Sequence, residues 1–374
     1  MIYWRPGKVS KASLVFLAIL AMACLFLVET RKEMRKQPYY DEKVAAVRLQ
    51  ASAMEAIKKE VLRHRRTLDP FTDPAGSGLI GRNLSPLTSV VGSLAAKQTS
   101  VNPNFAAVVI QLMKRLGLKE GDRVAVGATG SFPALNLAVL VGCKVLKLRC
   151  VMISSVAASM FGANHPRVTW LDMERIAYRE GFMDTRSVAA SIGGVDDNGA
   201  QLSETGVELI LRAIERNQVR LIREGSLQAN IEKRLQIYEE ASGGEPYKAF
   251  INIGGGEANV GSHFTKVLFR PGINRSLPRK KIPDEGAMTL LMRKYEIPAI
   301  HLSGVSQLAE RYGLPKAPRT MPPLAEGALF YDMVYSLPLV AVLMGVLIAA
   351  CFFVIRFDVG RMFRGVPTRK PPAA

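Results

Sequence analysis

Residues 123–136 read Arg-Val-Ala-Val-Gly-Ala-Thr-Gly-Ser-Phe-Pro-Ala-Leu-Asn. The β-branched run ends at Gly127, and a short turn leads to Ser131, where we expect a helix N-cap, and to Pro133 in the first helical turn. Free N–H groups at a helix start favour anions, and open α/β sheets bind ligands at the carboxyl ends of their strands. We therefore expect an anion site here, with the soluble part of the chain built around it.

The same alternation of strand and helix continues along the chain. Strands of four to seven residues are separated by helical patterns, which indicates a mostly parallel sheet covered on both faces. The expected fold class is α/β and Rossmann-like. The expected strands are 123–128, 150–156, 187–192, 220–223, 249–253 and 299–302.

Two uncharged apolar runs lie near the ends of this 374-residue chain. Residues 12–28 and 333–355 are long enough to span a membrane, so we expect two transmembrane helices. A signal peptide cleaved after Ala23, or a lipoprotein site at Cys24, is the alternative for the first run. We favour an uncleaved anchor because apolar residues continue through Val28.

Basic residues flank both spans and predict the orientation. The stub 1–11 and the tail 356–374 are rich in Lys and Arg, so we expect both termini in the cytoplasm and the central domain outside it. The cluster at 31–36, directly after the first span, argues for the opposite orientation. We give it less weight because long domains translocate largely regardless of charge.

The segments between the spans differ in composition. Residues 29–66 have apolar side chains at helical spacing and predict a stalk helix, either docked on the domain or paired in a coiled-coil dimer. Residues 67–315 are expected to form the α/β domain, beginning with a Pro- and Gly-rich loop over 69–99. Residues 316–332 are expected to be a Pro-rich linker.

Four cysteines are present. Cys24 and Cys351 lie in the spans. We expect Cys143 and Cys150 to be buried free thiols, with a disulfide as the alternative. No cysteine or histidine spacing indicates a metal site, and no cofactor is expected.

The first candidate site is the turn over 127–131. It matches neither a P-loop, nor a Gly-x-Ser-x-Gly elbow, nor Gly-x-Gly-x-x-Gly, so an ordinary capped turn is the competing interpretation. Its candidate ligand-binding residues are Gly127, Thr129, Gly130, Ser131 and Asn136.

A second candidate site follows the strand 249–253. Successive glycines let backbone N–H groups converge on an anion, although a flexible turn has the same composition. Glu257 and His263 add an acid and a base. The candidate ligand-binding residues are Asn252, Gly254, Gly255 and Gly256.

Two further polar clusters follow strands. One contains Ser154, Ser155, Asn164 and His165, whose ring we expect to be exposed because a proline follows it. Asp172, nearby, is a candidate carboxylate, although a helix dipole alone favours an acid there.

The other polar cluster, 193–199, is rich in Gly, Asp and Asn, as turns are. It is also a candidate cation or carboxylate site. Because the carboxyl ends of parallel strands share one edge, we expect all four clusters to meet there.

The chain carries a formal net charge of +18. Such a surface often binds nucleic acid, but we find no nucleic-acid module and no interleaved aromatic residues. An extracytoplasmic polyanion, or anionic lipid headgroups, fits better.

The motif set resembles the poly-gamma-glutamate system protein family. The resemblance rests on residues 130–136, 162–164, 170–173 and 252–256 and spans roughly residues 30–320. Members are encoded beside the poly-gamma-glutamate synthase ligase and its membrane partner. The resemblance implies a role in making, exporting or anchoring this capsule polymer, and it assigns no catalytic residues.

Three hypotheses follow. In the first, the protein is an accessory membrane protein of the synthase complex that binds poly-gamma-glutamate or a similar polyanion. In the second, it is a hydrolase or transpeptidase of γ-glutamyl amides, with Ser131 as nucleophile, His263 or His165 as base, and a carboxylate from Asp172, Asp196 or Glu257. In the third, the topology is reversed and the domain is a cytoplasmic nucleotide-binding partner of the ligase.

Overall fold

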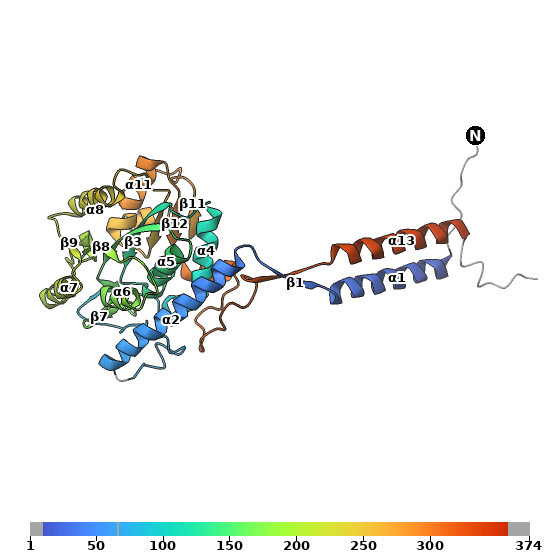
Figure 1. Cartoon of the computed structure of the whole chain (residues 1–374), viewed down its shortest axis with the longest axis horizontal. Helices are drawn as coiled ribbons and strands as arrows, with labels where there is room; N and C mark the ends of the chain where they lie inside the picture. Colours follow the sequence, from blue (N-terminus) through green and yellow to red (C-terminus); the bar gives the residue numbers. More distant parts are fainter. Residues whose placement is uncertain (1–9, 66, 358–374) are drawn as a thin grey trace, which may run out of the picture. The chain divides into compact units, whose positions relative to one another are not determined.

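The computed structural model describes residues 10–65 and 67–357 and divides into two units (Figure 1). The terminal unit contains the described residues up to Gln37 and from Tyr331 onward. The central unit contains Pro38–Phe330.

The terminal unit contains two apolar helices, α1 (Lys11–Thr30) and α13 (Leu337–Phe357), each long and apolar enough to cross a membrane. They contact each other, and the short strands β1 (Glu33–Lys36) and β13 (Tyr331–Val334) pair antiparallel beside them. The second helix therefore starts later than expected, because Met333 belongs to β13. The basic residues in 1–9 and 358–374, on which the orientation depends, lie outside the described residues.

The predicted stalk helix is shorter than expected and is docked. Helix α2 begins at Tyr40 and ends at Arg65, and residues 33–36 form β1 instead. Its apolar stripe, including Val47, Ile57 and Val61, is buried against α4 (Phe105–Arg115), α5 (Pro133–Val145) and α6 (Trp170–Arg179). The stripe is therefore covered by the chain itself, and the coiled-coil interpretation is wrong.

The main sheet of the described chain has seven strands in the order β11-β12-β10-β3-β4-β8-β9. All neighbouring strands pair parallel except β11, which is antiparallel to β12 at one edge. The strands are β3 (Arg123–Thr129), β4 (Arg149–Ser155), β8 (Ser187–Ser191), β9 (Arg220–Ile222), β10 (Ala249–Ile253), β11 (Gly272–Asn274) and β12 (Ala299–Leu302).

The strand order reverses next to β3. The chain adds β4, β8 and β9 on one side and then returns to place β10 and β12 on the other side. The turns after β3 and β10 therefore leave the sheet beside each other although more than a hundred residues separate them. In open α/β sheets, such a switch point is where ligands bind.

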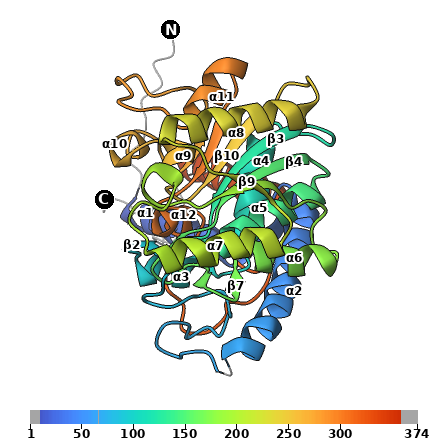
Figure 2. The same cartoon turned by 90° about the vertical axis from the view of Figure 1, so that its left-hand side faces the viewer.

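Helices cover both faces of the sheet (Figure 2). On one face, α5 is buried from Pro133 to Cys143, since the sheet lies on one side of it and α2 and α4 lie on the other. This position explains its apolar composition. On the other face lie α8 (Leu227–Ser242) and α11 (Ala287–Tyr295), which contact β4 and β10 respectively.

An aromatic cluster fills the core beneath α8 and α11. The rings of Tyr238 and Phe250 meet edge to face with centroids 6.0 Å apart, and Tyr247 contacts Tyr238 at the same distance. The Tyr238 hydroxyl is buried and donates to the Val126 carbonyl at 2.7 Å. This hydrogen bond satisfies the phenol while its ring joins α8 to the central strand.

The expected Pro-rich linker is fastened to the central unit. The Ala317 N–H donates to Thr99 Oγ1 at 3.0 Å, and the Asn104 amide donates to the Pro323 carbonyl at 2.8 Å. The buried Lys43 ammonium donates to the Leu329 carbonyl at 3.0 Å. Residues 317–329 are therefore part of the packed unit up to the boundary with β13.

The two soluble cysteines are free and buried, as predicted. Cys143 lies late in α5 and Cys150 in β4. The hydrogen bond between the thiols, together with burial, raises the pKa of Cys143 well above its usual range. Cys143 is thus held in the protonated, unreactive form.

The aromatic cluster allows a stability prediction. Replacing Phe250 by Ala leaves a cavity in a fully buried position, and we expect the free energy of unfolding to fall by about 3–5 kcal/mol. Phe71→Ala is the matched control, because that ring is 87% exposed. Chemical denaturation of the full-length protein in detergent measures both, and equal losses would contradict the assigned core.

Candidate functional site

The turn after β3 begins later than the sequence indicated. Gly127 lies inside the strand and is buried, and a Cβ there would come within 2.7 Å of the Asn259 side chain. Glycine is therefore needed for packing rather than for a turn. The strand continues to Thr129, and the turn consists of Gly130, Ser131 and Phe132.

Ser131 is not the N-cap of α5, which contradicts the prediction. Phe132 occupies the cap position without a capping side chain, while Pro133 opens the helix as expected. Ser131 Oγ instead accepts the backbone N–H of Ser159 at 3.0 Å. It joins the β3 turn to the segment that follows β4.

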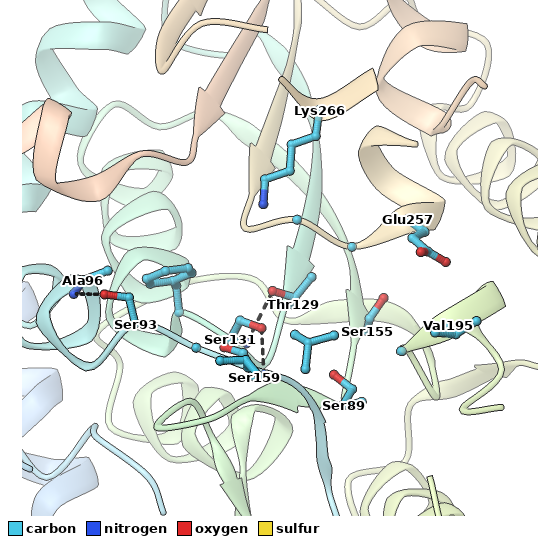
Figure 3. Close-up of a pocket in the computed structure, with 18 of the residues that line it drawn as sticks. Ser89, Ser93, Ala96, Thr129, Ser131, Ser155, Ser159, Val195, Glu257 and Lys266 are labelled. Carbon is cyan, nitrogen blue, oxygen red and sulfur yellow. Dashed lines mark hydrogen bonds between the residues drawn. The ribbon is translucent and has the colours of Figure 1, made fainter. Parts of the chain in front are cut away.

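The polar clusters meet in one cavity of about 250 Å³ at the carboxyl ends of β3, β4, β8 and β10, between the turns of the switch point (Figure 3). Each of the four clusters contributes to its wall, so the predicted convergence is confirmed. The lining residues are Ser89, Val90, Val91, Gly92, Ser93, Ala96, Lys97, Thr129, Ser131, Phe132, Ser155, Ala157, Ser159, Gly194, Val195, Gly255, Gly256, Glu257 and Lys266.

Residues 89–97 close the cavity opposite the sheet. Strand β2 (Thr88–Val90) pairs with β5 (Ala158–Ser159), and α3 (Leu94–Ser100) follows, capped by Ser93. The Pro- and Gly-rich loop predicted over 69–99 is thus partly regular. It brings hydroxyl groups and one lysine to the site.

Lys97, on α3, is 2% exposed and was not predicted as a site residue. Its Nζ donates to the Ser131 carbonyl and lies 3.5 Å from the centroid of the Phe132 ring. Burial, with a contribution from the charge of Lys266, lowers the pKa of Lys97 to about 7. No local sequence pattern indicates that Lys97 is a site residue, because the groups that contact its ammonium nitrogen come from the turn after β3.

Lys266 is the second lysine of the cavity. It extends from α10 (His263–Lys266) toward the glycine turn, and a Cβ on Gly255 would come within 2.4 Å of its Nζ (Figure 3). Burial lowers the pKa of Lys266. Within residues 10–65 and 67–357, neither Lys97 nor Lys266 forms a salt bridge with a carboxylate.

A buried ion pair supports the cavity from below. Arg234, fully buried on α8, donates to Asp197 Oδ2 at 2.9 Å and to the hydroxyls of Ser155 and Ser191 at 2.9 and 2.6 Å. It also donates to Asn259 Oδ1 at 3.1 Å. Asp197, in the fourth predicted cluster, is therefore neutralised by the protein and holds the ends of β4 and β8 together.

Glu257 lines the cavity, as one of the predicted residues. It opens α9 (Glu257–Val260), and its Oε2 accepts the Asp196 backbone N–H at 3.0 Å. This bond links α9 to the 3₁₀ turn η1 (Val195–Asp197) at the edge of the cavity. In the described chain, no group of three or more His, Cys, Asp or Glu residues is placed to hold a metal ion.

The two candidate histidines do not reach Ser131. His165 is buried, contrary to the prediction: its Nδ1 accepts the Arg167 N–H at 3.3 Å and its ring stacks on His64. Burial, with the charges of Arg82 and Arg65, lowers the pKa of His165 to about 4. His263 is exposed on α10, against Phe264, and neither histidine lines the cavity.

Asp172 is occupied within the fold. It closes a capping box at the start of α6, accepting from Thr169 N and Oγ1 at 2.8 Å each, and it pairs with Arg216. Although burial opposes ionisation, these partners keep the pKa of Asp172 below its usual value. The serine, histidine and carboxylate expected for catalysis are therefore not assembled.

Other predicted ligand-binding residues support the rim instead of lining the cavity. Asn136 donates to the Thr129 carbonyl at 2.8 Å, and Asn252 donates to the Gly254 carbonyl at 2.8 Å. Ser154 bonds Ser187 at 2.7 Å, and Asn164 accepts the Arg82 N–H at 2.8 Å. Each of these buried side chains has a hydrogen-bond partner within the fold, which explains why a polar residue stands there.

The fold and site define an α/β protein with a mostly parallel seven-stranded sheet in its described part, a lysine- and hydroxyl-lined cavity, and two apolar helices long enough to cross a membrane. No family model, no curated protein and no solved structure matches the chain.

The pKa of Lys97 allows a prediction about stability and pH. The folded protein releases this proton near pH 7, whereas an unfolded lysine keeps it to about pH 10.5. Between these values the unfolded state binds more protons, so the contribution of Lys97 to stability increases with pH, by at most about 1.4 kcal/mol per pH unit. We expect Lys97→Met to lack this component.

Denaturation of both proteins at pH 7, 8 and 9 tests this expectation. The stability of the wild type should rise relative to that of the variant over this range. Parallel pH profiles would show that Lys97 does not titrate there.

Proposed function

We propose that this protein is a membrane-anchored accessory protein of poly-gamma-glutamate synthesis or export, and that its cavity binds carboxylates of the polymer. The observation that carries the proposal is a pair of lysines, the buried Lys97 and the half-buried Lys266, which line one cavity without a salt bridge to a carboxylate in the described chain. Burying a charged group without a partner costs free energy. A ligand carboxylate that pairs with these lysines would lower that cost.

Most of the remaining wall suits the same ligand chemistry, with Glu257 as the one carboxylate among the lining residues of the described chain. Hydroxyl groups of serine and threonine and the backbone of Gly255 and Gly256 offer hydrogen-bond donors, and the positive end of the α5 dipole lies behind Phe132. A cavity of about 250 Å³ is below the usual range for drug-sized ligands, so it fits one small acidic unit. A polymer with one carboxylate per residue presents such units repeatedly.

The wider features of the chain agree with this assignment. The resemblance to the poly-gamma-glutamate system family, the net charge of +18 and the Rossmann-like reversal of strand order at β3 and β10 support it. In this proposal both termini are cytoplasmic and the central unit is extracytoplasmic, as part of the synthase membrane complex. Protease protection on intact cells tests that orientation.

Retention of poly-gamma-glutamate on the immobilised full-length protein in detergent tests binding. We expect retention that weakens as salt rises, and we expect Lys266→Met to reduce affinity by about tenfold or more, because a hydrogen bond to a charged group contributes about 1.5–3 kcal/mol. Lys147→Met is the matched control, because it removes the same charge from an exposed site by the amino end of β4.

Absence of retention at low ionic strength would overturn the proposal. Displacement of the polymer by a nucleoside triphosphate but not by short γ-linked glutamate peptides would favour the cytoplasmic nucleotide-binding alternative instead.

One observation favours hydrolysis of γ-glutamyl amides as a second candidate function. Lys97, with a pKa near 7, donates to the backbone carbonyl of Ser131 and is the basic side chain that contacts this turn in the described chain. Ser131 Oγ would attack the γ-carbonyl carbon while its proton passes to the neutral amine of Lys97. The C–N bond then breaks, Lys97 returns the proton to the leaving amine, and water hydrolyses the ester.

Polymer length after incubation with the protein tests this candidate. Shortening by the wild type that is lost in Ser131→Ala and Lys97→Met, and kept in Ser89→Ala, would support it. Ser89 is a suitable control because it lines the same cavity. Unchanged polymer length with the wild type would leave binding as the function.

A further inference from the structure

A second cavity lies beside the first along the same edge of the sheet. It has a volume of about 280 Å³ and shares three lining residues with the first cavity, namely Ala96, Phe132 and Lys266. Its other residues are Gly254, at the end of β10, and 303–307, which follow β12. The two cavities therefore form adjacent compartments, with Lys266 in the wall of each.

The chemistry of the two compartments differs. The first contains Lys97 and the carboxylate of Glu257 in addition to Lys266, whereas Lys266 is the only charged residue among those that line the second in the described chain. The second instead offers the hydroxyls of Ser303 and Ser306 and the amide of Gln307, which is exposed. A carboxylate there would be bound by neutral donors and by an ammonium that it shares with the first compartment.

Glycine is required at position 304 in the wall of this compartment. Its φ of +58° lies in the left-handed region, and a Cβ there would come within 2.7 Å of the Pro271 ring and 3.1 Å of Gln307 Oε1. A side chain at this position would be strained and would press against the amide that faces the compartment.

We infer that the protein recognises at least two consecutive acidic residues of an extended chain. One carboxylate occupies the Lys97 compartment, the next occupies the compartment formed by 303–307, and Lys266 lies between them. The ligand class is a γ-linked oligoglutamate rather than free glutamate. This inference rests on the proposed function and adds the minimum length of the ligand.

Calorimetric titration of the full-length protein in detergent with glutamate and with γ-linked di-, tri- and pentaglutamate measures this length. We expect affinity to rise by about tenfold or more from glutamate to the di- or tripeptide and to change little beyond it, since both compartments are then filled. In the double variant Ser306→Ala/Gln307→Ala this gain should fall below about threefold, with the affinity for glutamate unchanged.

Gln228→Ala is the matched control, because Gln228 is an exposed glutamine on α8 and lines neither cavity. Equal wild-type affinity for all lengths would overturn the second compartment but leave the proposed function intact. An equal loss for glutamate and the longer peptides in the double variant would also overturn the assignment. Failure of every ligand to bind would overturn the proposed function itself, and this inference with it.

Discussion

The pairing of β3 with β4 on one side and β10 on the other fixes the arrangement of the central unit. On one side β3 pairs with β4, the next strand of the sheet along the chain. On the other side it pairs with β10, which begins more than a hundred residues later. Both partners are parallel, so their turns leave at the same edge. Because the chain runs away from β3 in opposite directions on the two sides, the turns diverge there and leave room for a ligand.

The basic side chains at this edge differ in their partners. Arg234 is matched by Asp197 and by two serine hydroxyls, and this network connects α8 to the ends of β4 and β8. Lys97 and Lys266 have no such carboxylate in the described chain, although burial lowers the pKa of both. Arg234, which is salt-bridged to Asp197, is thus part of the scaffold. Lys97 and Lys266 line the cavity without a salt bridge in the described chain.

The outer parts of the central unit hold this arrangement in place. Helix α2 covers α5, and residues 317–329 bond to α2, α3 and the start of α4. Helix α3, which carries Lys97, therefore contacts both the turn after β3 and residues 317–329. In this way a lysine on a seven-residue helix reaches a buried position beside Ser131.

Three features could be predicted from the amino-acid sequence alone: the alternation of strand and helix, the carboxyl ends where polar residues collect, and the two apolar terminal helices. These features depend on local periodicity and composition, which a single chain displays directly. Only the tertiary structure decided that Gly127 is a packing residue, that Ser131 is tied to Ser159, and that His165 and Asp172 lie away from the cavity. It alone brought Lys97 and Lys266 to the site, because burial and pKa depend on groups contributed by distant segments, and no local pattern records which segments those will be.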